Sequence, residues 1–335
     1  MTRLVIVLML GAQAATAVVG KTPRTVDGKP DLQGVWNYSS DVPLERPKEY
    51  ADRTLVTRDE RAKQNAAREA SFDRLLTTGV GAHDKFWLDY EAQVEDLRTS
   101  LITYPENGRL PKLVDGVQRV GGFAAIFNDV KGTLPVRFFA GGIGKDGPED
   151  RGLFERCLAG PNTGPPLTPG GDNNYLEIAQ TRDYVLVLTE HIHDARIIPL
   201  DQKPHVGQSV RMWNGDARGR WEGTTLVVET TNFNGKGMLA TSAASGRLRG
   251  VAQGANSHVV ERFTPLDKDT IKYEVTITDR EAFSQPVTIM MPLNRDENYL
   301  IVEYGCHEGN YAIPNELTAG RKADRDAVGA KTSTP

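Results

Sequence analysis

The alternation of apolar and polar residues through the second half of the chain constrains its fold most strongly. Eight short runs alternate in this way, at 175–180, 184–193, 209–213, 224–231, 258–264, 270–278, 287–292 and 298–304. Such runs are typical of half-buried β-strands. Short turns at 219–223 and 266–269 join neighbouring runs, which favours antiparallel pairing of sequential strands. The pattern predicts a mainly β fold whose meander closes into a barrel, with a β-sandwich as the alternative.

The residues before this region predict a different kind of structure. Residues 21–174 read as an extended lead-in, a first strand at 31–38, one helix and loops rich in Gly and Pro that pack on the barrel. Thr57 and Glu60 have the spacing of a capping box, and the run that follows predicts a helix over 57–76. The barrel core is expected at 175–322, and the polar residues 323–335 predict a disordered tail.

The first twenty residues have the features of a secretory signal peptide. Arg3 precedes an apolar run at 4–10, and small residues follow at 12–17. The run is too short to span a bilayer, so we expect no membrane insertion after signal cleavage and a periplasmic or secreted mature protein. The formal net charge of −4 over 335 residues gives no reason to expect a nucleic-acid partner. The residues do not indicate an oligomeric state.

The chain has two cysteines, Cys157 and Cys306, and the expected export decides which redox state they encounter. An oxidising compartment favours a disulfide between them. The alternative is that Cys306, beside His307, is a thiol nucleophile activated by the imidazole.

Five of the six histidines lie between His191 and His307. His191 and His193 are two residues apart on a predicted strand, which would place both rings on one face. A third histidine, His307, could complete a site for a divalent metal such as zinc, and His205, Glu190 or Glu303 are other possible third ligands.

The same region also carries the groups needed for proton transfer without a cofactor. A carboxylate such as Glu303 that faces a barrel interior would have a raised pKa unless it is paired, for example with Arg196. Loops near the barrel mouth could bind an aromatic ligand. The predicted ligand-binding residues are Trp36, Asn174, Tyr175, Trp213 and Arg220.

Gly34-Val35-Trp36 at the opening of the first strand resembles lipocalins and their calycin relatives, in which the Trp closes one end of the barrel. More of the chain, about 31–322, resembles a large family of exported bacterial proteins without an established activity. The segments that carry this resemblance are DLQGVW at 31–36, RTSLI at 98–102, EDR at 149–151, ERC at 155–157, GPP at 164–166, EHIHDAR at 190–196, GRWEG at 219–223, TTNF at 230–233, ERF at 261–263 and EYGCHEGNY at 303–311.

The family resemblance adds two expectations. Both cysteines belong to the family pattern, which favours the disulfide. The pattern also features Glu190, His193, Arg196 and His307, whereas an apolar residue usually takes the place of His191. The resemblance therefore implies an acid–base constellation, with Glu303 as a fifth member, rather than a metal site.

Three functions follow as hypotheses. The first is an exported enzyme of the lyase or isomerase type, without a cofactor, in which His193 and His307 with Glu190 or Glu303 move a proton of an apolar or aromatic substrate. Arg196 would stabilise a developing oxyanion. The second is a non-catalytic periplasmic protein that binds a small-molecule ligand in the same cavity. The third is a metal-dependent hydrolase that uses His191, His193 and His307.

Overall fold

The computed structural model describes residues 22–50, 52–78, 96–117, 119–121, 147–148, 153, 156–160, 162–240 and 249–332. The signal peptide predicted at 1–20 lies outside these residues.

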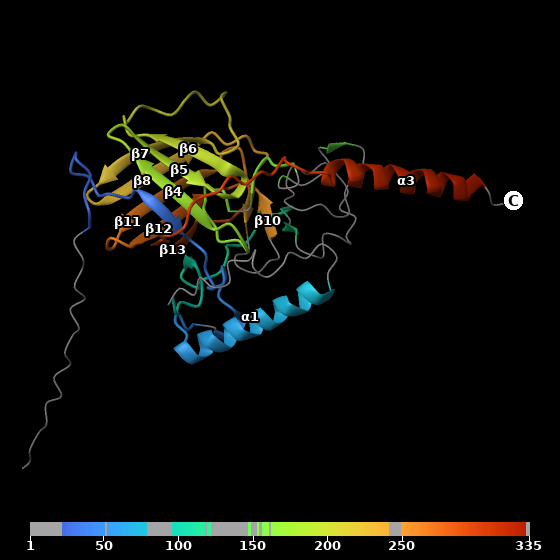
Figure 1. Ribbon diagram of the computed structural model, residues 1–335, viewed down its shortest axis with the longest axis horizontal. Coiled ribbons are helices and arrows are strands. Elements are labelled where there is room, and N and C mark those ends of the chain that lie inside the picture. Colours follow the sequence, from blue (N-terminus) through green and yellow to red (C-terminus); the bar gives the residue numbers. More distant parts are fainter. Residues whose placement is uncertain are drawn as a thin grey trace, which may run out of the picture.

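An antiparallel sheet of ten strands makes up most of the fold (Figure 1). Its main path runs in the order β6-β5-β4-β1-β13-β12-β11-β8-β7, and β2 (Ile102–Tyr104) pairs with β13. The strands of the path are β1 (Gly34–Asn37), β4 (Tyr175–Gln180), β5 (Tyr184–Thr189), β6 (Asp194–Pro199), β7 (Asp216–Glu222), β8 (Thr225–Thr231), β11 (His258–Pro265), β12 (Thr270–Thr278) and β13 (Val287–Arg295). A second, three-stranded sheet consists of β3 (Val120–Gly121), β10 (Arg249–Ala252) and β9 (Met238–Ala240).

Strand β1 joins the two halves of the main sheet, because it pairs with both β4 and β13. From β4 onward, strands of the main sheet that follow one another along the chain are neighbours in the sheet, except at β6 and β7, which end the path. These two strands pack side by side, and side chains bridge them. Asn214 donates a hydrogen bond to Asp194, and Gly219 lies against Ile198, where a Cβ would come within 2.8 Å. The predicted antiparallel meander is confirmed, as a nearly closed barrel with one seam.

Side chains fill the barrel interior. Along β11 and β12 every second residue is buried, as the period of a strand requires. Large rings occupy much of the space: Tyr38, Phe263 and Tyr273 are fully buried, and the rings of Phe263 and Tyr273 are 5.1 Å apart. Packed side chains of the described residues therefore form a core inside the barrel.

Trp36 belongs to this core, at the junction of β1 with the end of β13. Its indole N–H donates to the carbonyl oxygen of Leu32 at 2.9 Å, and the Arg295 guanidinium lies 4.3 Å from its ring centroid. Arg295 also donates to the backbone oxygens of Gln33 (2.6 Å) and Lys268 (2.8 Å). Trp36, which the sequence suggested as a ligand contact, is thus covered by Arg295.

Two long helices lie outside the barrel (Figure 1). Helix α1 (Arg58–Thr78) begins with the predicted capping box: Glu60 N donates to Thr57 Oγ1 at 3.2 Å, and Thr57 N to Glu60 Oε2 at 2.8 Å. Helix α3 (Ala312–Thr332) extends away from the barrel. The prediction of a disordered tail from residue 323 is therefore wrong as far as 332. Among the described residues, neither helix is long and apolar enough to cross a membrane.

Several strands differ from the sequence prediction. The run at 184–193 ends as a strand at residue 189, and the chain turns back into β6. The run at 298–304 has no strand, and 209–213 forms only the isolated bridge of Met212 with Phe233. Residues 219–222 belong to β7, and the turn to β8 follows them.

A substitution at Gly34 tests whether its contact with Arg295 stabilises this end of the barrel. Its φ of +124° is a conformation that residues with a Cβ rarely adopt, and an added Cβ would meet Nη1 of Arg295. We expect Gly34→Ala to lower the free energy of unfolding by about 1–3 kcal/mol, measured by urea denaturation. Gly28→Ala is the control, because Gly28 has a φ of +79° with no atom within 4 Å of the added Cβ. Equal losses in the two variants would show that the contact with Arg295 contributes nothing.

Candidate functional site

The Glu190–His193 turn carries the most conspicuous polar motif of the sequence. The chain leaves β5 at Thr189 and forms the 3-10 turn η4 (His191–His193), in which Ile192 and His193 have positive φ values of 62° and 45°. The turn buries His191 and exposes His193. The prediction that both rings lie on one face of a strand is therefore wrong, because the backbone is not extended there.

We call residues 296–311 the C-terminal segment. The side chains of Glu190, His191 and His193 all contact this segment. Tyr299 donates its hydroxyl to Oε1 of buried Glu190 at 2.7 Å. The ring of Tyr304 packs edge-on against His191, 4.9 Å between centroids, and its carbonyl oxygen accepts a hydrogen bond from Nδ1 of His193 at 2.9 Å. The turn and the segment together form a clasp.

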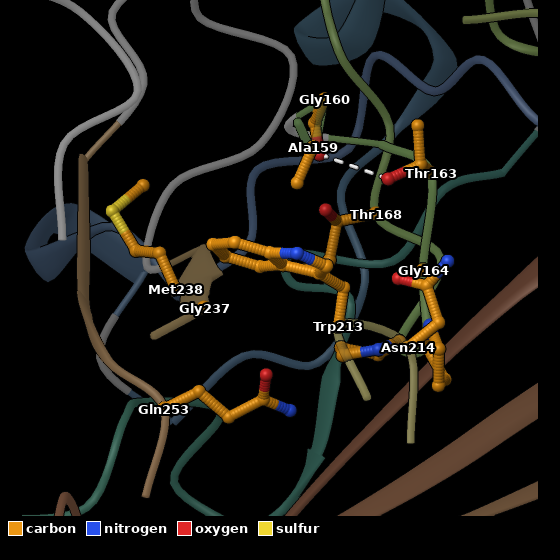
Figure 2. Close-up of a pocket in the computed structure, with 12 residues that line it drawn as sticks. Ala159, Gly160, Thr163, Gly164, Thr168, Trp213, Asn214, Gly237, Met238 and Gln253 are labelled. Atoms are coloured by element: carbon orange, nitrogen blue, oxygen red, sulfur yellow. Dashed lines mark hydrogen bonds between the residues drawn. The ribbon is translucent and has the colours of Figure 1, made fainter. Parts of the chain in front are cut away.

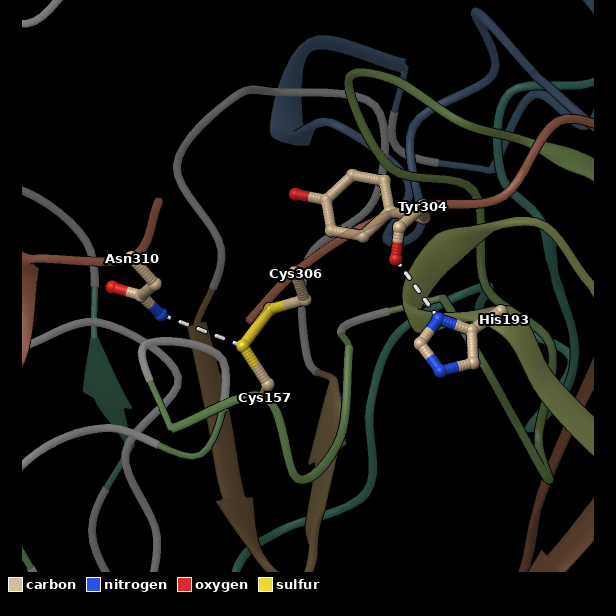
Figure 3. Close-up of a disulfide and its surroundings, with 5 residues drawn as sticks. All are labelled: Cys157, His193, Tyr304, Cys306 and Asn310. Carbon is tan, nitrogen blue, oxygen red and sulfur yellow. Dashed lines mark hydrogen bonds between the residues drawn. A yellow bond between two sulfur atoms is a disulfide. The ribbon is translucent and has the colours of Figure 1, made fainter. Parts of the chain in front are cut away.

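A disulfide between Cys157 and Cys306 fastens the same segment (Figure 3). The two Cα atoms are 5.8 Å apart, and Asn310 donates its side-chain N–H to Sγ of Cys157 at 3.5 Å. The predicted disulfide is confirmed, and Cys306 is therefore not a free thiol nucleophile. The bond fits an oxidising compartment. His307 and Glu303 are exposed on this segment, so the structure does not gather them with Glu190 in an enclosed site.

Arg196 lies inside the barrel, apart from the clasp. Its guanidinium donates to both carboxylate oxygens of Glu261, at 2.6 and 3.0 Å, and both residues are buried, at 5% and 0% exposure. Tyr273 donates its hydroxyl to Glu261 at 2.9 Å and accepts a hydrogen bond from Leu167 N at 3.0 Å. Burial opposes the charge of Arg196, but Glu261 outweighs it, so the pKa of Arg196 is raised. Arg196 thus serves an interior ion pair.

Three predicted ligand contacts have structural partners. Asn174 is buried and exchanges two hydrogen bonds with the backbone of Gly170, at 2.6 and 3.2 Å. The ring of Tyr175 stacks on Tyr299, with 3.6 Å between centroids. Arg220 is exposed on the outer face of β7 and pairs with Glu222 at 2.7 Å.

Trp213, in contrast, lies in a cleft beside the barrel, which we call the Trp213 cleft. Figure 2 shows its indole between Met238 and Thr168. The cavity volume of the cleft is about 30 Å³, and the cleft is partly open to solvent. Its lining is apolar or neutral and consists of Ala159, Gly160, Thr163, Gly164, Pro165, Pro166, Thr168, Trp213, Asn214, Gly237, Met238 and Gln253.

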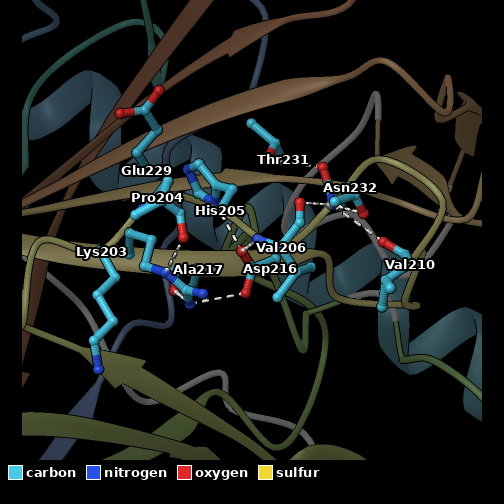
Figure 4. A network of polar contacts seen from close by, with 12 residues as sticks. Lys203, Pro204, His205, Val206, Val210, Asp216, Ala217, Glu229, Thr231 and Asn232 are labelled. Carbon is cyan, nitrogen blue, oxygen red and sulfur yellow. Dashed lines mark hydrogen bonds and ion pairs between the residues drawn. The ribbon is translucent and has the colours of Figure 1, made fainter.

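A polar network fixes the loop that carries Trp213 (Figure 4). Asp216, at the start of β7, accepts hydrogen bonds from His205 Nδ1 at 2.9 Å and from Val206 N at 3.0 Å. The side-chain amide of Asn232 donates to three loop carbonyls, those of Val206, Gly207 and Val210, at 3.0–3.2 Å. These contacts hold the loop that carries Trp213 against β7 and β8.

Sequence reasoning named Trp213 but missed Gln253, Met238 and Thr168. These residues come from strands or loops far apart in the chain, and none belongs to a recognisable motif. Apart from Trp213, only Gly164-Pro165-Pro166, which forms one wall of the cleft, belongs to a segment that the sequence had singled out, the GPP segment of the family resemblance.

Comparisons with protein-family models, with curated proteins and with solved structures found no match for this chain. In the part of the chain that the structure describes, no three His, Cys, Asp or Glu side chains are grouped as metal ligands would be. His205, a possible third ligand in the sequence, instead pairs with Asp216.

The buried imidazole of His191 predicts a pH dependence. Burial lowers the pKa of His191 to about 4, from an ordinary value of 6.5. Because the unfolded chain binds the proton more tightly, the free energy of unfolding should fall as pH drops from 6.5 to 4, by about 3 kcal/mol from this residue. Urea denaturation of His191→Gln should show a flatter pH profile than the wild type, whereas His193→Gln should not. An unchanged slope in His191→Gln would contradict the assignment.

Proposed function

We propose that this chain is an exported, non-catalytic protein that binds a small apolar or aromatic molecule in the Trp213 cleft. One observation carries the proposal: all twelve lining residues are apolar or neutral, and one of them presents a large aromatic face. Binding sites for small molecules are typically concave and mostly apolar, with a few polar groups that fix orientation.

The distribution of ionisable groups supports binding over acid–base catalysis. A general acid or base must lie within hydrogen-bonding reach of the proton it moves. Of the five predicted catalytic residues, Glu190 and Arg196 are buried in contacts with Tyr299 and Glu261. The other three, His193, Glu303 and His307, are exposed and do not line the cleft.

The metal-dependent hydrolase has less support still. His191 is buried, with Nδ1 against the amide oxygen of Asn162, whereas His193 points to solvent. Two ligands of one tetrahedral metal must converge on a single point, and these rings do not.

Export is supported by the disulfide, because such bonds persist in oxidising compartments and are rare in the cytosol. The predicted signal peptide agrees with this inference, and we propose the periplasm or the extracellular space as the location.

Ligand capture tests the proposal. Purified protein is incubated with a small-molecule extract of the host, separated by gel filtration, and the retained compounds are identified by mass spectrometry. We expect the wild type to enrich at least one compound, unchanged in mass, and Trp213→Ala to lose at least tenfold of it, because the stacking face is gone. His193→Ala, outside the cleft, should retain it.

Two results would contradict the proposal. Equal retention by Trp213→Ala and the wild type would place the ligand elsewhere. Conversion of the compound by the wild type but not by His193→Ala would instead identify an enzyme.

A further inference from the structure

The two cysteines of the disulfide differ in their exposure to solvent (Figure 3). Cys157 is buried, with 8% of its surface exposed. Cys306 is half-buried, and its two chain neighbours, Gly305 and His307, are both exposed. A thiolate opens a disulfide by attacking one of the two sulfur atoms, and the rate depends on access to that atom. An attacking thiolate therefore reaches Sγ of Cys306 more readily than Sγ of Cys157.

A hydrogen-bond donor points at the sulfur atom that would then leave. The side-chain N–H of Asn310 donates to Sγ of Cys157 at 3.5 Å. If attack occurs at Cys306, the bond between the sulfur atoms breaks and Cys157 departs as a thiolate. A hydrogen bond to the charged form stabilises a thiolate, and a better stabilised thiolate leaves faster. Asn310 is therefore placed to assist the opening of the bond in this direction.

The backbone at Cys157 also favours opening. Its φ of 54° lies in the left-handed region, which residues with a Cβ seldom adopt. A residue held in this region carries backbone strain. Strained or accessible disulfides are easier to reduce than relaxed, buried ones. This bond combines strain at one cysteine with access to the other.

The C-terminal segment lies outside the sheet, so it can move while the barrel stays intact. Strand β13 ends at Arg295, immediately before the segment. Near the disulfide, three backbone N–H groups donate to carbonyl oxygens of the segment itself: Cys306 to Tyr304, Glu308 to Gly305 and Asn310 to His307. The clasp adds side-chain hydrogen bonds and a ring contact, each of which contributes modestly to stability. The covalent bond is therefore the strongest attachment of the segment to the rest of the chain.

We propose that the Cys157–Cys306 disulfide is a reversible redox latch, which a dithiol opens through Cys306 and whose opening loosens the C-terminal segment from the Glu190–His193 turn. The latch does not depend on the proposed ligand-binding function. In the first step a thiolate of the dithiol bonds to Sγ of Cys306, and the electron pair of the broken bond goes to Sγ of Cys157. In the second step the other thiolate of the dithiol attacks its own sulfur in this mixed disulfide and releases Cys306. The dithiol leaves as a disulfide, and the two cysteines gain its two electrons and two protons.

Trapping of the mixed disulfide tests the direction of attack. The folded chain, without urea, is incubated briefly with glutathione, a monothiol that lacks the second thiol of a dithiol, and the freed cysteine is alkylated with excess iodoacetamide. Mass spectrometry of the peptides should find glutathione on Cys306 and the alkyl group on Cys157 at least about tenfold more often than the reverse. Equal or reversed labelling, or a bond that reacts only in urea, would overturn the latch.

Hydrogen exchange of the backbone amides tests the release. In dithiothreitol, peptides from residues 296–311 should exchange at least about tenfold faster than in the oxidised chain, because local opening no longer has to strain a covalent bond. Peptides from β11 and β12 should exchange as before. No increase in residues 296–311, or an equal increase in the barrel strands, would contradict the latch.

A variant of Asn310 tests its role in the opening. Asn310→Leu should slow reduction by dithiothreitol about threefold, because the leaving thiolate loses its donor. Asn298→Leu is the matched control: Asn298 is exposed on the same segment, and this variant should react at the wild-type rate. A merely structural role of Asn310 would have the opposite effect, since a looser segment exposes the sulfur atoms. An unchanged or faster rate in Asn310→Leu would therefore contradict the assignment.

Discussion

The ion pair of Arg196 with Glu261 is the interaction on which the rest of the structure depends. Strand β6, which carries Arg196, ends the path of the sheet at the seam beside β7. The side chain of Arg196 crosses the interior to Glu261 on β11. Because β6 has a hydrogen-bonded neighbour, β5, on one side only, this ion pair is what fixes its position on the other side. Tyr273 extends this contact to Leu167, beside the Pro-rich wall of the Trp213 cleft. Closure of the barrel and the shape of the cleft thus share one buried network.

Much of the barrel could be predicted because strand periodicity is a local property of the sequence. Strands β4, β8, β11 and β12 coincide with the predicted runs within a residue or so, and the capping box places the start of α1. The fold departs from the pattern where tertiary contacts override it. At Ile192 a β-branched residue takes a left-handed backbone conformation, which no local signal announces. The run at 298–304 alternates like a strand, yet its tyrosines pack on the Glu190–His193 turn instead.

The candidate site was harder to predict for a related reason. Histidine, glutamate and arginine draw attention in a sequence because they can do chemistry, but the same groups also make the strongest tertiary contacts. Here Glu190, His191 and His193 hold the C-terminal segment, and Arg196 holds the seam. The Trp213 cleft is built from ordinary residues of distant segments, so only the three-dimensional arrangement reveals it. The disulfide could be predicted from two cysteines and the expectation of export.

A double-mutant cycle of Arg196→Met and Glu261→Leu tests the role of the buried pair most directly, with the free energy of unfolding measured in urea and the disulfide intact. Each single variant leaves an uncompensated charge in the interior and should lose about 3–5 kcal/mol. The double variant should lose clearly less than the sum of the two, because apolar side chains replace both charges. Losses below about 1 kcal/mol in the single variants, or strict additivity in the double variant, would contradict the view that this pair holds the barrel closed.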